Sequence, residues 1–197
     1  IPLHLLEARR ARGHALPAAA QVARDPTALV PPLHRAALLL ARVRGARRER
    51  PLVRDDELLC ARHHVLLLWP HTFMNVSGTS VLAARDFYKI EDEDLLVLCD
   101  DFQLPLGKLR LRTGGSSGGQ KGLDDCLRRL GSQYLPRLRL GIGPVPERWK
   151  VADFVLGKFD ESDQSQVQQM VRRSADAVET WISSGIQEAM NRFNGDL

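Results

Sequence analysis

The chain has 197 residues, a formal net charge of +4 at pH 7 and three cysteines. A chain of this length is expected to fold as one domain that buries roughly two-thirds of its unfolded surface. No apolar run approaches the ~20 residues of a membrane span, and three cysteines without metal spacing argue against a disulfide framework or a zinc site, so we expect a protein of the reducing cytoplasm without a membrane anchor or a metal.

Residues 1–64 have an unusual composition, because they contain no Phe, Tyr, Trp, Lys, Asn or Met and are dominated by Arg, Ala and Leu. A domain of that length normally supplies aromatic residues to a core. Two interpretations stay open: a divergent or disordered arm, or a GC-rich gene translated in a wrong frame. We therefore expect two parts, an anomalous segment over 1–64 and an α/β domain over 65–197.

From residue 65 onward, apolar runs and turn residues alternate in the pattern of strands and helices. Continuous apolar runs or strict alternation predict four strands, at 65–69, 95–98, 108–112 and 137–142. Helical spacing predicts four helices, at 79–89, 122–130, 163–183 and 186–193. The segment 151–156 is expected to be a short strand or an extended connection. Strands that alternate with helices predict a single-domain α/β sandwich, with a twisted, mixed, largely parallel sheet flanked by helices.

A glycine-rich loop with two serines precedes the second predicted helix, at residues 114–122. Such density lets backbone N–H groups approach an anion or a sugar closely. The pattern is not a P-loop, because Gln120 stands where a lysine should directly follow the glycine, and no GxGxxG fingerprint follows a strand here. A flexible surface loop is the alternative interpretation.

Polar side chains stand just after two of the predicted strands. Asp100 and Asp101 follow the strand at 95–98, and Asn75 follows the strand at 65–69. Ligands of α/β sheets bind beyond the carboxyl ends of strands, where an acid can orient a histidine or bind a metal. Helix or turn capping is the alternative for all three residues. The loops that follow the strands at 65–69, 95–98 and 108–112 are expected to converge on one edge.

The stretch between Lys108 and Arg139 is basic, with eight Lys or Arg and only two acids. Such residues could track a phosphate backbone, and a solvated charged face is the alternative. All six histidines lie at or before His71, and His71 is the only one that we place near a candidate site.

Five ordered motifs over about Val65 to Phe193 resemble the bacterial peptidyl-tRNA hydrolase family. They are FMNVSG (73–78), VLCDDFQLPLG (97–107), GGSSGGQKGLDD (114–125), RLRLGIG (137–143) and VLGKF (155–159). The resemblance implies a monomeric α/β enzyme of translation. It also implies hydrolysis of the ester that joins a peptide to the 3′ end of tRNA, without a metal or cofactor.

The resemblance further implies roles for individual residues. Asn75 matches the family's asparagine that contacts the substrate near the scissile ester, and Phe73 matches an aromatic position that flanks the tRNA end. Asp100 matches the aspartate that orients the catalytic histidine. The glycine loop, with Gly118 and Gly119, matches the loop that closes over the peptide and the 3′ adenosine.

Three departures from the family pattern matter. The histidine before the aspartate is Cys99 here, and the loop asparagine is Lys121, which can contact phosphate but cannot accept a hydrogen bond. The N-terminal GxGNPG and TRHN motifs are absent, so the general-base histidine is not identifiable; its position falls near Thr27. Without the family's first strand, neighbouring strands are expected to have unpaired edges.

Ester hydrolysis at neutral pH needs a base for the attacking water and donors for the developing oxyanion. Our first hypothesis is peptidyl-tRNA hydrolysis, in which Asp100 fixes a histidine tautomer while Asn75 and loop amides position the carbonyl. The second is a catalytically inactive relative that binds tRNA or another RNA. A third hypothesis makes His71 a replacement base.

Overall fold

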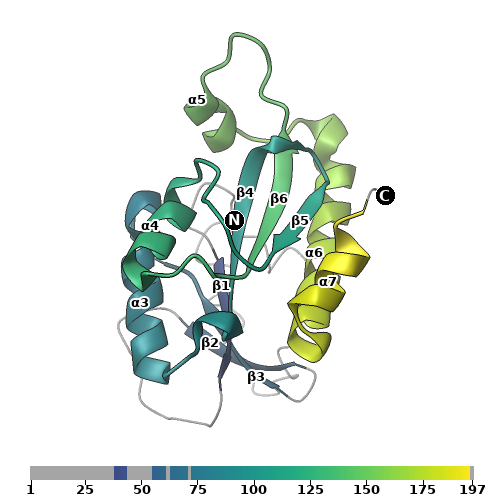
Figure 1. Cartoon of the computed structure of the whole chain (residues 1–197). Helices are drawn as coiled ribbons and strands as arrows, with labels where there is room; N and C mark the ends of the chain where they lie inside the picture. Colours follow the sequence, from purple (N-terminus) through teal and green to yellow (C-terminus); the bar gives the residue numbers. More distant parts are fainter. Residues whose placement is uncertain (1–37, 44–54, 61–62, 71, 196–197) are drawn as a thin grey trace, which may run out of the picture.

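The computed structural model describes residues 38–43, 55–60, 63–70 and 72–195, which form a sheet with helices on both faces (Figure 1). Its six strands lie in the order β2–β3–β1–β4–β6–β5. Their bounds are β1 Leu38–Val43, β2 Asp55–Cys60, β3 His63–Leu68, β4 Leu95–Pro105, β5 Leu109–Arg112 and β6 Arg137–Gly143. The predicted α/β architecture, a mixed sheet flanked by helices, is confirmed.

The prediction of a largely parallel sheet is wrong for the described strands, among which β4 and β6 form the only parallel pair. β1 runs antiparallel to β3 and β4, and the pairs β2–β3 and β5–β6 are also antiparallel. Short connections explain the directions of β3 and β5. Only residues 61–62 lie between β2 and β3, and only 106–108 between β4 and β5, whereas a parallel connection needs a crossover of roughly a dozen residues or more.

Two helices cover each face of the sheet. Their bounds, with those of the short 3-10 turns, are η2 Met74–Val76, α3 Ser77–Tyr88, η3 Asp92–Asp94, α4 Lys121–Leu130, α5 Val151–Leu156, η4 Glu161–Asp163, α6 Gln164–Ser184 and α7 Ile186–Phe193. α3 and α4 lie on one side, and α6 and α7 on the other (Figure 1). None of the helices in the described part combines the length and apolar character that crossing a bilayer requires.

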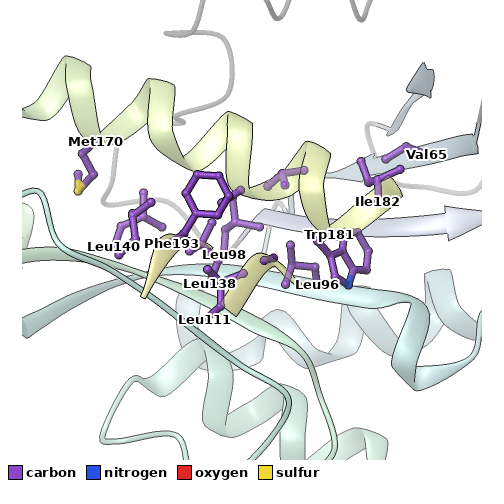
Figure 2. Packing of buried hydrophobic residues seen from close by; sticks show 14 of the residues in the cluster. Val65, Leu96, Leu98, Leu111, Leu138, Leu140, Met170, Trp181, Ile182 and Phe193 are labelled. Carbon is purple, nitrogen blue, oxygen red and sulfur yellow. The ribbon is translucent and has the colours of Figure 1, made fainter. Parts of the chain in front are cut away.

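Two hydrophobic clusters hold these layers together, because successive strand residues point to opposite faces. Leu66 and Val97 face α3 and α4 in one cluster. Leu98 faces α6 and α7 in the other, where Trp181 and Phe193 pack onto the sheet (Figure 2). Trp181 is fully buried. Each predicted buried strand therefore contributes to both cores.

Two strands come from the unusual N-terminal segment. β1 is paired with β3 on one side and β4 on the other, so the expectation that these neighbours have unpaired edges is wrong. The proposed boundary between 1–64 and 65–197 stays a prediction. The expected arm, as far as residue 37, lies outside the described residues.

Two local predictions also need correction. β4 continues past the apolar run, because Asp100 and Asp101 pair with Leu140 and Gly141 of β6, so these acids lie inside the strand and do not follow it. The expected strand or extended connection at 151–156 is the helix α5. Periodicity alone cannot separate a strand from a helix in so short a run.

Candidate active site

The two adjacent acids of β4 have different environments. Asp101 Oδ2 forms an ion pair with Arg139 Nε at 3.0 Å. Asp101 Oδ1 also accepts a 2.9 Å hydrogen bond from Gln103 N. Asp100 Oδ1 instead accepts a 3.3 Å hydrogen bond from Gln120 Nε2. Asp101 is therefore held by a cation and Asp100 by a neutral amide.

The electrostatics of Asp100 follow from its burial. Burial raises the pKa of this carboxyl above its ordinary value, and the negative charge of Asp101 raises it further. The hydrogen bond from Gln120 and the charge of Arg139 oppose the rise. A buried carboxylate with a raised pKa is common at functional sites, although structural networks produce such shifts as well.

Gln120 connects Asp100 to the start of α4. It is the N-cap residue of this helix, and its Oε1 accepts a 2.7 Å hydrogen bond from Leu123 N. Its Nε2 also lies 3.5 Å from Met74 Sδ. Gln120 was not among the predicted site residues, although its position just before a predicted helix marks it as a cap candidate.

The FMN segment lies next to Gln120 and the start of α4. Met74 begins η2 and packs on α4, where a Cβ built on Gly122 would lie 2.6 Å from Met74 Sδ. The flanking Phe73 and Asn75 are exposed, Phe73 at 84%. The structure thus brings together the FMN segment, Asp100 and the glycine loop, and leaves Phe73 and Asn75 accessible to a ligand.

Arg137 anchors the glycine loop through hydrogen bonds to the backbone carbonyls of the loop. This side chain is 2% exposed and donates to the carbonyls of Gly115 at 2.6 Å and Ser116 at 3.0 Å. It also donates to Leu135 O at 2.9 Å. Burial lowers the pKa of Arg137. The idea that this arginine tracks a phosphate backbone is wrong, because the side chain is buried and its donors serve backbone carbonyls.

The predicted loop residues differ in their surroundings. Gly118 has φ +59°, and a Cβ there would lie 2.6 Å from the Arg139 guanidinium, so a side chain would be strained and crowded. Gly119 has φ +86° and open space around its Cα. Lys121 is the exposed first residue of α4. Gly119 and Lys121 flank Gln120 in the sequence, and the roles of all three residues stay predictions.

Among the histidines, only His63 has a described side chain. His63 begins β3, and the last residue of this strand, Leu68, lies opposite Leu39 of β1. The neighbouring Leu38 pairs with Leu98 of β4, so Leu68 marks the end of β3 that lies nearer to Asp100. His63 therefore lies at the opposite end of the strands from Asp100. His71, considered as a replacement base, lies outside the described residues.

Cys99 stands directly before Asp100. Burial raises the pKa of its thiol to about 12, and the charge of Asp100 adds to the rise. The thiol is therefore protonated at neutral pH and serves neither as a base nor as a thiolate nucleophile. The general base is not identified among the described residues.

The chain is similar to known proteins of one family. The family model described as peptidyl-tRNA hydrolase matches residues 39–197. A peptidyl-tRNA hydrolase of Rhodopirellula baltica is 52% identical over 130 residues, which are 66% of this chain and 68% of that protein. One of Elusimicrobium minutum is 43% identical, over 66% of this chain and 70% of that protein.

A solved structure gives the same result for the fold. The crystal structure of the Acinetobacter baumannii peptidyl-tRNA hydrolase superimposes with a TM-score of 0.67 and 33% identity, over 72% of this chain and 71% of that chain. The family model covers most of the described sheet and the whole candidate site. On this evidence the chain belongs to the peptidyl-tRNA hydrolase family.

Proposed function

We propose that this protein hydrolyses the ester bond between a peptide and tRNA and thereby recycles tRNA in translation. Membership of the family and relatives named peptidyl-tRNA hydrolase support the reaction class. The structural observation that carries the proposal is the hydrogen bond from Gln120 to Asp100. It joins the glycine loop to the buried acid, beside the exposed FMN segment.

Asp100 acts in this proposal through a histidine. Water must lose a proton as it attacks the ester, and a neutral imidazole is suited to accept it near pH 7. A buried carboxylate that accepts the other imidazole N–H fixes the tautomer and stabilises the imidazolium that forms. The described residues supply this carboxylate and do not supply the histidine.

The remaining site residues serve substrate binding. Asn75 is exposed beside Met74 and has an amide that can donate to the ester carbonyl as negative charge develops on its oxygen. Phe73 offers a bare aromatic face on which the terminal base of tRNA can stack. Lys121 supplies a point charge for phosphate. Gly118 and Gly119 lie in the loop that would close over the substrate, and the N–H of Gly119 donates to Ser117 Oγ at 3.4 Å in the unliganded protein.

The expected molecular context stays a prediction. We propose a monomer of the cytoplasm that needs neither metal nor cofactor. Size-exclusion chromatography coupled to light scattering tests the monomer, and retention of activity after dialysis against EDTA tests the independence from metal. A second subunit or a loss of activity reversed by a divalent cation would contradict these points.

The second candidate function is RNA binding without turnover. Cys99 and Lys121 in place of the family's residues, and the absence of the GxGNPG and TRHN motifs from the sequence, favour it. The retention of Asp100 in a hydrogen-bonded, buried setting disfavours it, because a binding module has little use for an acid that orients a base. The two functions differ in the effect of Asp100→Asn, which leaves affinity for tRNA unchanged in both but abolishes turnover only in an enzyme.

The experiment uses the full chain and N-acetyl-aminoacyl-tRNA. We expect release of free tRNA by the wild-type protein and a large loss of rate in Asp100→Asn. The exposed Asp176→Asn on α6, the helix on the opposite face of the sheet from α4, makes the same chemical change and serves as the matched control. Tight tRNA binding without hydrolysis by the wild-type protein would establish the RNA-binding function and reject the enzyme.

A further inference from the structure

Gln120 makes contacts with three separate segments of the chain. Its carbonyl oxygen accepts from Leu123 N at 2.7 Å, and its amide nitrogen lies 3.3 Å from Asp100 Oδ1 and 3.5 Å from Met74 Sδ. The side-chain oxygen thus accepts a hydrogen bond from α4, one N–H donates to β4, and the other N–H faces the sulfur in η2. Neutral amides have two donors of this kind, and both are engaged here.

The cap fixes which end of the amide faces Asp100. Leu123 N is a backbone donor of the first helical turn and needs an acceptor, so the oxygen of Gln120 must point to the helix. The nitrogen must then point away from it, toward Asp100. Rotation of the amide by 180° would leave the helix N–H facing a donor and Asp100 facing an oxygen.

The residue type supports a purpose beyond capping. Ser, Thr, Asp and Asn are the preferred N-cap residues, because their short side chains reach the N2 or N3 amide. A glutamine is a longer and less favoured cap. Its additional methylene group gives the reach to cap α4 and contact Asp100 with the same amide.

The charged groups around Asp100 cannot perform the same task. Asp101 lies next to it and repels the carboxylate, and Arg139 is committed to an ion pair with Asp101. Cys99 is a protonated thiol. Among the described side chains, Gln120 is the one that donates directly to Asp100.

We infer that Gln120 is a positioning residue, which holds Oδ1 of Asp100 so that Oδ2 is directed at the base. The inference rests on the proposed function for the role of Asp100, but not for the contact itself. A donor on one carboxylate oxygen restricts rotation of the group and favours its ionised form. The base would then meet an oriented, charged acceptor.

Two substitutions separate positioning from capping. Gln120→Glu keeps the oxygen that accepts from Leu123 N, replaces the donor by an acceptor and adds a like charge beside Asp100. Gln120→Ser keeps a favoured cap and cannot reach Asp100. Gln166→Glu is the matched control, because Gln166 is exposed on α6 and donates to Leu106 O at 2.7 Å.

The decisive measurement is the titration of Asp100 by carboxyl ¹³C NMR, with the signal assigned through Asp100→Asn. We expect the midpoint to rise by about one pH unit or more in Gln120→Glu and to rise less in Gln120→Ser. Gln166→Glu should leave it in place. An unchanged midpoint in both Gln120 variants would overturn the inference.

The wild-type protein gives a second measurement that needs no variant to fold. The side-chain NH₂ signal of Gln120 should shift with pH at the same midpoint as the Asp100 carboxyl, because the two groups share a hydrogen bond. A Gln120 signal that does not respond to this titration would reject the contact.

Kinetics then distinguish this inference from the proposed function. In an active protein, Gln120→Glu should lower kcat about tenfold or more at pH 7 with KM within about twofold, and should move the acid limb of the pH profile upward. A fall that is confined to KM would contradict positioning. A wild-type protein without turnover would reject the proposed function, and the two NMR titrations would still decide the contact.

Discussion

Gly78 N donates a 2.9 Å hydrogen bond to Oδ2 of the buried Asp125 and so joins the first turn of α3 to α4. Asp125 also pairs with Arg128 and Arg129 of its own helix. A buried carboxylate is costly unless its oxygens are satisfied, and here all partners are in place. The Gly78–Asp125 hydrogen bond therefore fixes the spacing between the FMN segment, which leads into α3, and the glycine loop, which leads into α4.

Gly78→Ala should weaken the contact between α3 and α4. A Cβ there would overlap the backbone carbonyl of Asp125 and lie 2.8 Å from Cys126 N, and backbone cannot move aside as a side-chain tip can. We expect a loss of about 1–3 kcal/mol in the free energy of unfolding, measured by guanidinium denaturation. The exposed Thr79→Ala on the same helix is the control. A Gly78→Ala protein as stable as wild type would show that α3 and α4 can separate without cost.

Asp100→Asn should lower the hydrolytic activity and raise the stability of the folded protein at pH 8. The folded pKa of Asp100 is raised by burial, so the ionised carboxylate destabilises the folded protein at a pH above that value. The penalty decreases as pH falls through the folded pKa and is absent below the unfolded value of ~3.9. The variant should therefore be more stable than wild type at pH 8 and lose this advantage toward pH 4.

The same variant should hydrolyse N-acetyl-aminoacyl-tRNA about 100-fold more slowly or worse, because an unoriented base loses much of its contribution. Unfolding at pH 5 and pH 8, together with single-turnover rates, checks both halves. A variant that is less stable than wild type at pH 8 would contradict the sign of the pKa shift.

Arg137→Lys should loosen the glycine loop. The guanidinium serves the carbonyls of Gly115 and Ser116 with one nitrogen and that of Leu135 with another, and a single ammonium group cannot span these positions. We expect a loss of about 2–3 kcal/mol in unfolding free energy and faster amide exchange at residues 114–119. The control is Arg112→Lys, the exposed residue opposite Arg137 on β5. Equal exchange in the two variants would argue against the anchoring role.

The sequence predicted those parts of the molecule that depend on local pattern. The apolar runs at 65–69 and 95–98 became β3 and β4, because both faces of these strands are buried, and the apolar stripe from 163 to 183 became α6, which buries one face. The loops after the strands at 65–69 and 95–98 were predicted to converge, and Gln120 contacts both Met74 of the FMN segment and Asp100. The catalytic roles of Asn75 and Asp100 stay predictions.

Other features depend on partners far away in the chain. Arg137 looks like an exposed basic residue on an alternating strand, but its acceptors belong to residues 115 and 116, which only the tertiary fold brings near. The strand β1 was not predicted, because it lies in the Arg-, Ala- and Leu-rich residues 1–64, which lack the aromatic residues of an ordinary core. Without it, the antiparallel half of the sheet could not be predicted.

Asn194→Ala should expose the edge of the sheet. Asn194 follows α7 and imitates a neighbouring strand, because its Oδ1 accepts from Leu111 N at 2.6 Å and its Nδ2 donates to Leu111 O at 3.1 Å. β5 is an edge strand, and unpaired edge groups template association. We expect a loss of about 1–3 kcal/mol for two hydrogen bonds and concentration-dependent light scattering at 37 °C. The exposed Gln187→Ala on α7 should do neither; scattering by both variants would assign the effect to the helix.

Cys99 should resist thiol reagents in the folded protein. Its side chain is 5% exposed, and burial raises the pKa of its thiol to about 12, so at pH 8 only about one part in 10⁴ is thiolate. Labelling by a disulfide reagent should therefore proceed at the rate of global unfolding and accelerate in parallel with it in denaturant. Cys99→Ser should keep the hydrolysis rate within about threefold, since a protonated thiol neither attacks the ester nor accepts the water proton. Rapid labelling of Cys99 under native conditions, with loss of hydrolysis, would instead give this thiol a part in catalysis and reopen the question of which group serves as the base.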